Sequence, residues 1–181
     1  MHKLRITIST AALIFGIAIV GVSLTAVSPV HSAEGDLQAS HRRVYFGETI
    51  LPDHAVYPAL MMMDRVELET APLNKKLDLQ VEYSLRRLEY ARQLIEKNEI
   101  ELALTTLTKS QKYMLHAAED VKAPEVPLEV QKDMLIVLDR YIAQVRHLDQ
   151  HFSNSQLVAI NELIDELEAA QYHLQLCVKA E

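Results

Sequence analysis

Apolar residues recur from residue 77 onward at alternating spacings of three and four, which is the period of one face of an α-helix. Four long stretches keep this pattern, and each carries a single apolar stripe. In chain order the stripes comprise Leu77, Val81, Ser84, Leu88, Ala91 and Ile95; Ile100, Ala103, Leu104, Leu107, Met114 and Val121; Leu128, Leu135, Leu138, Ile142, Val145 and Phe152; and Leu157, Ile160, Ile164, Leu167 and Leu174. The pattern predicts four long amphipathic helices.

Helix-breaking residues mark where the first helices begin and end. Pro58 suits the first turn of a helix, so we expect a short helix over residues 59–69. Pro72 opens the first long helix, which is expected to run to about Lys97. Asn98 then marks its end, because asparagine tolerates the left-handed backbone conformation that closes many helices.

Two prolines also separate the second long helix from the third. The sequence KAPEVP, residues 122–127, blocks helix continuation twice. A third helix is expected from there to Phe152, and the segment from Ser153 to Gln156 has the pattern of a capping box ahead of the fourth.

The expected helix lengths indicate how the helices pack. At about 25 residues each, the four helices would be roughly 37 Å long. Rods of matched length joined by short turns favour an all-α fold, an antiparallel up-down four-helix bundle preceded by a short helix and an N-terminal signal or anchor helix. The alternative is a pair of helical hairpins that complete a bundle only in a dimer.

Residues 1–33 have the three parts of an export signal. Lys3 and Arg5 form a basic start, residues 11–22 are densely apolar, and small residues follow. The wider apolar stretch, residues 6–27, is close in length to the ~20 residues that cross a bilayer, so a cleaved signal peptide and an uncleaved anchor both stay open. In either case we predict that the rest of the chain is exported to the periplasmic or extracellular side of a membrane.

The remainder of the chain divides into a linker and a helical domain. Residues 34–50 mix polar side chains without a period and are interpreted as the linker. Residues 51–181 are interpreted as the helical bundle domain. No glycine follows Gly47, which favours helices over β-hairpins in this part of the chain.

Composition excludes several classes of function. The formal charge is -7, and after the first 33 residues 16 basic and 25 acidic side chains remain, a balance that would repel nucleic acid. Cys177 is the single cysteine, so no intramolecular disulfide can form. Without a glycine after Gly47 to build a nucleophile elbow or a phosphate loop, we predict that the chain is not an enzyme and uses no cofactor.

The sequence HLDQH contains the best candidate for metal binding. His147 and His151 are four residues apart, which places them one turn apart on one helical face. Two imidazoles can hold a transition metal, with His173 or His116 as candidates for a third ligand. The motif lacks the glutamate that follows the first histidine in HExxH hydrolases, so hydrolytic chemistry is not indicated.

Two further polar features have simpler interpretations. The run from Met61 to Met63 is expected to fill apolar gaps, although a soft metal held with His54 is an alternative. Arg86 and Arg87 are expected to lie on a solvated helix face and to pair with nearby glutamates.

The segment ILPDHAVYP, followed by a proline, a lysine-bearing helix start and an RRL sequence, resembles an uncharacterised bacterial family of exported helical domains. The matching positions are Leu51, Pro52, Asp53, Tyr57, Pro58, Lys75, Lys76, Leu77, Arg86, Arg87 and Leu88, within residues 49–120. The resemblance implies an extracytoplasmic helical domain and supplies no catalytic residues. We expect the LPD-x-x-x-YP motif to fasten the linker onto the bundle, with Leu51, Val56 and a largely buried Tyr57 as the packing residues.

These observations predict an extracytoplasmic helical module that binds or supports other molecules through its exposed faces. Its expected partner is a protein, with a membrane engaged through residues 1–33 if that segment is not cleaved, and no nucleic acid. A homodimer stays open. The alternative function is a transition-metal-binding four-helix bundle that uses His147 and His151.

Overall fold

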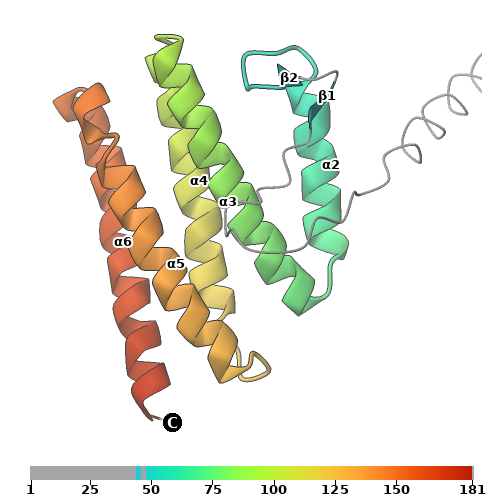
Figure 1. The fold of residues 1–181 in the computed structure, drawn as a ribbon, viewed down its shortest axis with the longest axis vertical. Helices are drawn as coiled ribbons and strands as arrows, with labels where there is room; N and C mark the ends of the chain where they lie inside the picture. The colour runs from blue at the N-terminus through green and yellow to red at the C-terminus, as the bar shows by residue number, and fades with distance from the viewer. Residues whose placement is uncertain (1–43, 46–47, 181) are drawn as a thin grey trace, which may run out of the picture. The chain divides into compact units, whose positions relative to one another are not determined.

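The computed structural model describes residues 44–45 and 48–180, which form two short strands, five α-helices and one 3-10 helix. Their bounds are β1 Val44–Tyr45, β2 Glu48–Thr49, α2 Tyr57–Thr70, α3 Leu73–Glu96, α4 Ile100–Asp120, α5 Leu128–Arg146, η1 Asp149–His151 and α6 Asn154–Ala180 (Figure 1). The chain separates into two units, residues 1–37 and 38–181, and all described residues belong to the second. The predicted signal or anchor segment lies outside the described residues.

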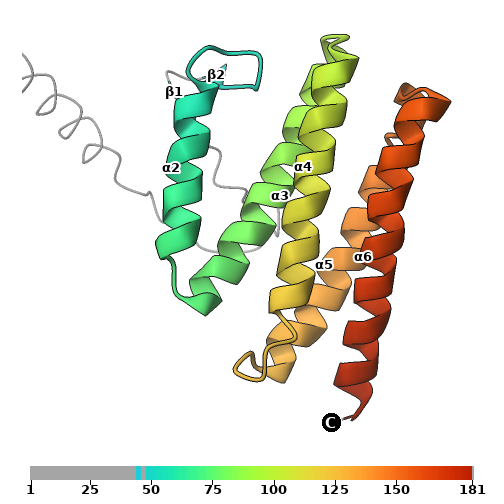
Figure 2. The same ribbon diagram turned by 180° about the vertical axis from the view of Figure 1, so that it is seen from behind.

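The prediction of an all-α fold is confirmed for the described part of the chain. Helix α3 packs along α4, α4 along α6, and α6 along α5, with a smaller contact between α4 and α5. Seen from both sides, these four helices lie next to one another as a helical bundle, and α2 lies beside α3 (Figures 1 and 2). Helix α2 makes fewer contacts with α3 than α4 does.

The turn between α3 and α4 was predicted correctly, down to the residue that makes it. Asn98 has a φ angle of 63°, and among the described residues it is the one non-glycine residue with a positive φ. Its amide donates to the carbonyl of Ile95 at 2.9 Å, and the amide of Glu99 donates to the carbonyl of Leu94 at 2.8 Å. These two bonds close the end of α3 as a Schellman motif, so α4 can begin at once.

The third long helix is shorter than predicted. Helix α5 begins after Pro127 as expected but ends at Arg146, and a 3-10 turn at Asp149–His151 replaces its last residues. Leu148 and Phe152 are both buried, and the tighter turn brings both into the core within a short length of chain. The prediction of one helix through Phe152 was therefore wrong.

Half of the predicted capping box is present ahead of α6. The side-chain oxygen of Gln156 accepts a hydrogen bond from the amide of Ser153 at 2.9 Å. The Ser153 hydroxyl lies 3.0 Å from the same oxygen. The glutamine therefore satisfies an amide that the helix itself leaves without a partner.

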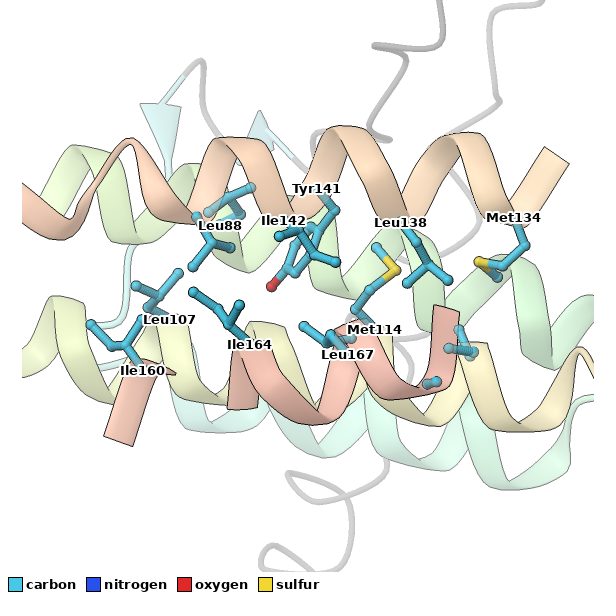
Figure 3. Packing of buried hydrophobic residues seen from close by; sticks show 14 of the residues in the cluster. Leu88, Leu107, Met114, Met134, Leu138, Tyr141, Ile142, Ile160, Ile164 and Leu167 are labelled. Carbon is cyan, nitrogen blue, oxygen red and sulfur yellow. The ribbon is translucent and has the colours of Figure 1, made fainter. Parts of the chain in front are cut away.

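The predicted apolar stripes meet in one core. Leu88, Leu107, Leu138, Ile160, Ile164 and Leu167 come from four different helices and point toward one another (Figure 3). Val81, Ile95, Ile100, Leu104, Leu135 and Leu157 pack against this core and are partly buried. Burial of these stripes is the main stabilising contribution to the bundle, because apolar area removed from water contributes about 25 cal/mol per Å².

Polar side chains cross the same core between α3, α4 and α5. The hydroxyl of Ser110 donates to the carbonyl of Ser84 at 2.6 Å and lies 2.8 Å from the hydroxyl of Tyr141. Tyr141 is 1% exposed, and its hydroxyl points inward in Figure 3. Burial raises the pKa of this tyrosine, while the hydrogen bonds from Ser110 and Ser84 oppose the shift. Satisfying these hydroxyls locks the three helices in register.

The linker region contains a small difference from the sequence-based expectation. Val44 pairs with Thr49 and Tyr45 with Glu48 in an antiparallel hairpin, where no strand was predicted. Val44, Thr49 and Tyr45 are β-branched or aromatic, and such residues favour an extended backbone. Pairing the two short strands gives their backbone groups hydrogen-bond partners. Of the helices in the described ranges, none is both long enough and apolar enough to span a membrane.

Candidate functional site

Helix α2 buries a carboxylate among half-buried apolar side chains and leaves other apolar side chains exposed. Its one fully buried residue is Asp64, at 1% exposure. Met62 and Val66, two positions away on either side, are 71% and 60% exposed. Apolar side chains normally turn toward the core of an amphipathic helix, so a specific interaction must hold α2 in this orientation.

That interaction is an ion pair with α3. Arg86 donates a hydrogen bond from Nη2 to Oδ2 of Asp64, and Arg87 brings its own Nη2 to 3.9 Å from the same oxygen. Both arginines are only 3% exposed. The prediction of a solvated arginine face was therefore wrong, because Asp64, 22 residues upstream of Arg86, provides a charge partner that the local sequence does not reveal.

Aromatic rings enclose the arginines. The guanidinium of Arg86 lies 4.7 Å from the ring centre of Tyr83, and that of Arg87 lies 4.3 Å from the ring centre of Tyr113 on α4. The two tyrosine rings meet edge to face at 6.0 Å. Cations over aromatic faces are stabilised by the ring quadrupole, most strongly where water is excluded.

The remaining polar atoms of this cluster are mostly engaged. Nη1 of Arg87 donates to the carbonyl of Tyr83 at 3.1 Å, and its Nη2 donates to the sulfur of Met61 at 3.0 Å. The hydroxyl of Tyr83 donates to Glu67 at 3.0 Å. Burial raises the pKa of Tyr83, and the negative charge of Asp64 raises it further. The tyrosine therefore stays protonated and keeps donating to the glutamate.

Two atoms in the cluster have no hydrogen-bond partner among the described residues, namely the buried Nε of Arg86 and the buried Nε of Arg87. Because the guanidinium groups are closed off from solvent, the arrangement can position α2 but offers little room to a substrate. A buried ion pair contributes little net stability, yet removing one partner is costly. The pair therefore selects which face of α2 turns inward.

The LPD-x-x-x-YP motif ties the start of α2 to the far end of α3. Leu51 is 6% exposed, and the carboxylate of Asp53 accepts a hydrogen bond from Nζ of Lys97 at 2.7 Å. Pro52 is half-buried, and Pro58 is exposed in the first turn of α2. The motif thus connects the start of α2, through Asp53, to Lys97 at the end of α3.

Tyr57 is half-buried, where the sequence predicted a largely buried ring. It meets the ring of Tyr90 edge to face, with centres 6.2 Å apart. Burial raises the pKa of Tyr57, and the charge of Arg87 opposes this. Val56 is 48% exposed, so the prediction that it packs on the bundle was wrong. Leu51 and Tyr57 carry the packing instead.

The outward face of α2 is apolar and shallowly hollowed. Met62, Met63, Val66 and Glu67 line an open hollow of about 390 Å³. Met61 is half-buried, but Met63 is 40% exposed and Met62 more so. The prediction that the three methionines fill apolar gaps fits the half-buried Met61 and not Met62 or Met63, because consecutive residues point in different directions around a helix.

A second groove lies between α2 and α4, next to this face. It has a volume of about 350 Å³ and is lined by Arg65, Leu68, Glu69, Lys109, Lys112, Tyr113 and His116. Arg65 pairs with Glu69 at 2.8 Å. In the described part of the chain, no salt bridge is formed by Lys109 or Lys112, so the groove carries a local excess of positive charge on an acidic chain.

The predicted metal-binding histidines are not on one helix. His147 is the residue that caps α5, and His151 ends the 3-10 turn, so the chain changes its helical period between them. Both are exposed, as are His116 and His173. Within the described residues, no three His, Cys, Asp or Glu side chains converge as ligands. Metal binding by His147 and His151 stays a prediction.

The sequence did contain a signal for the buried cluster. Leu79, Tyr83, Arg86 and Tyr90 recur at spacings of four, three and four, which makes a second stripe on α3 beside the apolar one. All four are buried. In the sequence alone, a stripe that contains tyrosines and an arginine cannot be told from a solvated face. The position of Asp64 in the structure shows that this stripe is buried.

Comparison of the chain with family models, with curated proteins and with solved structures gave no match.

Proposed function

We propose that this chain is an exported helical module that works by non-covalent binding, with the outward face of α2 as its working surface. In this proposal the four long helices form an antiparallel up-down bundle behind an N-terminal signal or anchor segment. The bundle serves as a rigid support, and α2 is the element that the support presents.

One observation carries the proposal, namely that α2 buries the charged Asp64 while it leaves Met62, Met63 and Val66 exposed. Exposed apolar side chains cost free energy in water, at about 25 cal/mol per Å². Burying the charged Asp64 costs desolvation free energy, and exposing Met62 and Val66 forgoes the stabilisation that their burial would give. Such an arrangement is explained if a partner covers the apolar face.

The experiment compares two sets of polar substitutions in the full chain within its native cells. A photo-crosslinking side chain at Met63 reports what lies against α2. The variant Met62→Gln, Val66→Thr should fold as stably as the parent, because both side chains are exposed, and should lose the crosslinked products. The matched control, Ile136→Thr with Val158→Thr, removes exposed apolar side chains from α5 and α6 and should keep them.

The proposal would be overturned if the α2 variant kept every crosslinked product, or if the control lost them equally. A protein, a second copy of the chain and a membrane each offer an apolar counter-surface. The charged side chains of the groove between α2 and α4 favour one of these three partners.

A further inference from the structure

We infer that the outward face of α2, together with the basic groove between α2 and α4, docks on an anionic lipid bilayer. The inference rests on the proposed binding role of α2 and names its partner. It combines an apolar face, an adjacent excess of cations and the place of α2 in the chain.

The exposed apolar residues of α2 meet the requirements of a bilayer contact. Met62, Met63 and Val66 are flexible or small, and they line a shallow, open hollow. Stable protein interfaces are usually centred on aromatic or arginine side chains seated in pockets. An interfacial helix needs only an apolar side that enters the boundary between headgroups and acyl chains.

The neighbouring cations provide charge complementarity to lipid phosphates. Lys109 and Lys112 are exposed and, among the described residues, form no salt bridge, whereas Arg65 on the α2 side of the same groove is paired with Glu69. After residue 33 the chain has 16 basic and 25 acidic side chains, so this local excess opposes the average charge. Anionic lipid surfaces attract such clusters.

The same charges disfavour a symmetric dimer through α2. In a two-fold interface the same patch of both copies meets, so the basic groove of one copy would approach that of the other. Like charges brought together raise the energy of the complex. A bilayer rich in anionic lipid has no such conflict.

Helix α2 is also the first helix after the predicted export segment. Residues 28–56 separate the apolar stretch, residues 6–27, from the start of α2. If that stretch stays in the bilayer, the short tether holds α2 near the membrane surface at a high effective concentration. Weak affinity of α2 for lipid is then sufficient for docking.

The test uses the full chain reconstituted in vesicles, with Cys177→Ser to remove the native cysteine. A spin label at Met62→Cys is compared with one at Tyr172→Cys, another exposed site, on α6. In vesicles of equal parts phosphatidylcholine and phosphatidylglycerol, the label at 62 should collide with lipid-soluble oxygen and be shielded from a water-soluble nickel complex. The label at 172 should show the reverse.

Charge reversal tests the groove separately. Lys109→Glu with Lys112→Glu should lower the partition of position 62 into the inserted state by about 25-fold or more, because each cation near an anionic surface contributes roughly a factor of five to the partition and each glutamate adds a repulsion. The matched control, Lys132→Glu with Lys179→Glu, makes the same charge change on α5 and α6 and should leave the insertion unchanged.

Two results would overturn the inference. A label at 62 that is shielded from both reagents indicates a protein contact, and spin-spin broadening between labels identifies that contact as a second copy. A label open to the nickel complex in every vesicle shows that α2 does not dock on lipid. Neither result affects the proposed binding role of α2, which is tested separately by the crosslinked products of the polar α2 variant and of its control in cells.

Discussion

Arg86 on α3 donates a hydrogen bond to Asp64 on α2, and both side chains are almost entirely removed from solvent. The two residues are 22 positions apart in the sequence. Because the rest of the contact between α2 and α3 is small, this pair and its aromatic surroundings decide how α2 is oriented. The apolar outward face of α2 follows directly from that orientation.

Removing the carboxylate should therefore be costly. We expect Asp64→Ala to lower the free energy of unfolding by about 3–5 kcal/mol, because it removes the buried carboxylate from two buried guanidinium groups and, among the described residues, leaves Arg86 only the more distant Glu82, at 3.9 Å. Urea-induced unfolding followed by circular dichroism measures this change.

A neighbouring pair on α2 provides the control for that measurement. Arg65 and Glu69 form a salt bridge in which both side chains are largely exposed. Arg65→Ala should change the stability by only about 0.5 kcal/mol, as is typical of surface pairs. If Asp64→Ala were as mild as Arg65→Ala, the ion pair would not be what orients α2.

The turn at Asn98 should tolerate glycine and reject a β-branched residue. Its φ angle of 63° costs a residue with a Cβ roughly 1–2 kcal/mol, which asparagine partly avoids. We expect Asn98→Val to lower the melting temperature and Asn98→Gly to leave it unchanged or slightly raised, as thermal unfolding would show. Equal effects of the two substitutions would contradict a left-handed turn at this position.

The buried hydroxyl of Tyr141 should contribute measurably to the core. Tyr141→Phe removes one of the hydrogen-bond partners of Ser110 and is expected to cost about 1 kcal/mol in unfolding free energy. Tyr172→Phe makes the same chemical change at a site that is 59% exposed and should cost almost nothing. A cost at Tyr141 no greater than that at Tyr172 would show that the hydroxyl network does not stabilise the bundle.

Asp120 should make part of the stability dependent on acid pH. Burial acts to raise the pKa of Asp120, but hydrogen bonds from Lys76 and Gln80 outweigh it and lower the pKa below its usual 3.8. A carboxyl whose pKa is lower in the folded state adds stability above its unfolded pKa and loses it as the pH falls through the folded value.

The measurement compares unfolding near neutral pH and at about pH 3. Asp120→Asn should show a smaller loss of stability on acidification than the parent chain, because its side chain does not titrate. Lys76→Met should reduce the same loss, since it removes one of the two stabilising donors. An acid dependence that is identical in the parent and in Asp120→Asn would count against this assignment.

The sequence alone was sufficient for the helical class and for most helix ends. Prolines at 72 and 127 lie immediately before α3 and α5, and Asn98 adopts the positive φ that its residue type favours. These signals are local, because each acts through the backbone angles or the missing amide of a single residue. The apolar stripes likewise identified core positions on all four long helices, since a helix repeats every 3.6 residues wherever it lies.

Only the tertiary structure decided the orientation of α2, the burial of Arg86 and Arg87, and the shortened end of α5. A charged residue is buried when a partner from another element neutralises it, and the one here is Asp64 on a different helix. No periodicity within α3 contains that information. The sequence determined which segments become helices, while the pairing of distant charges determined which face of α2 meets the solvent.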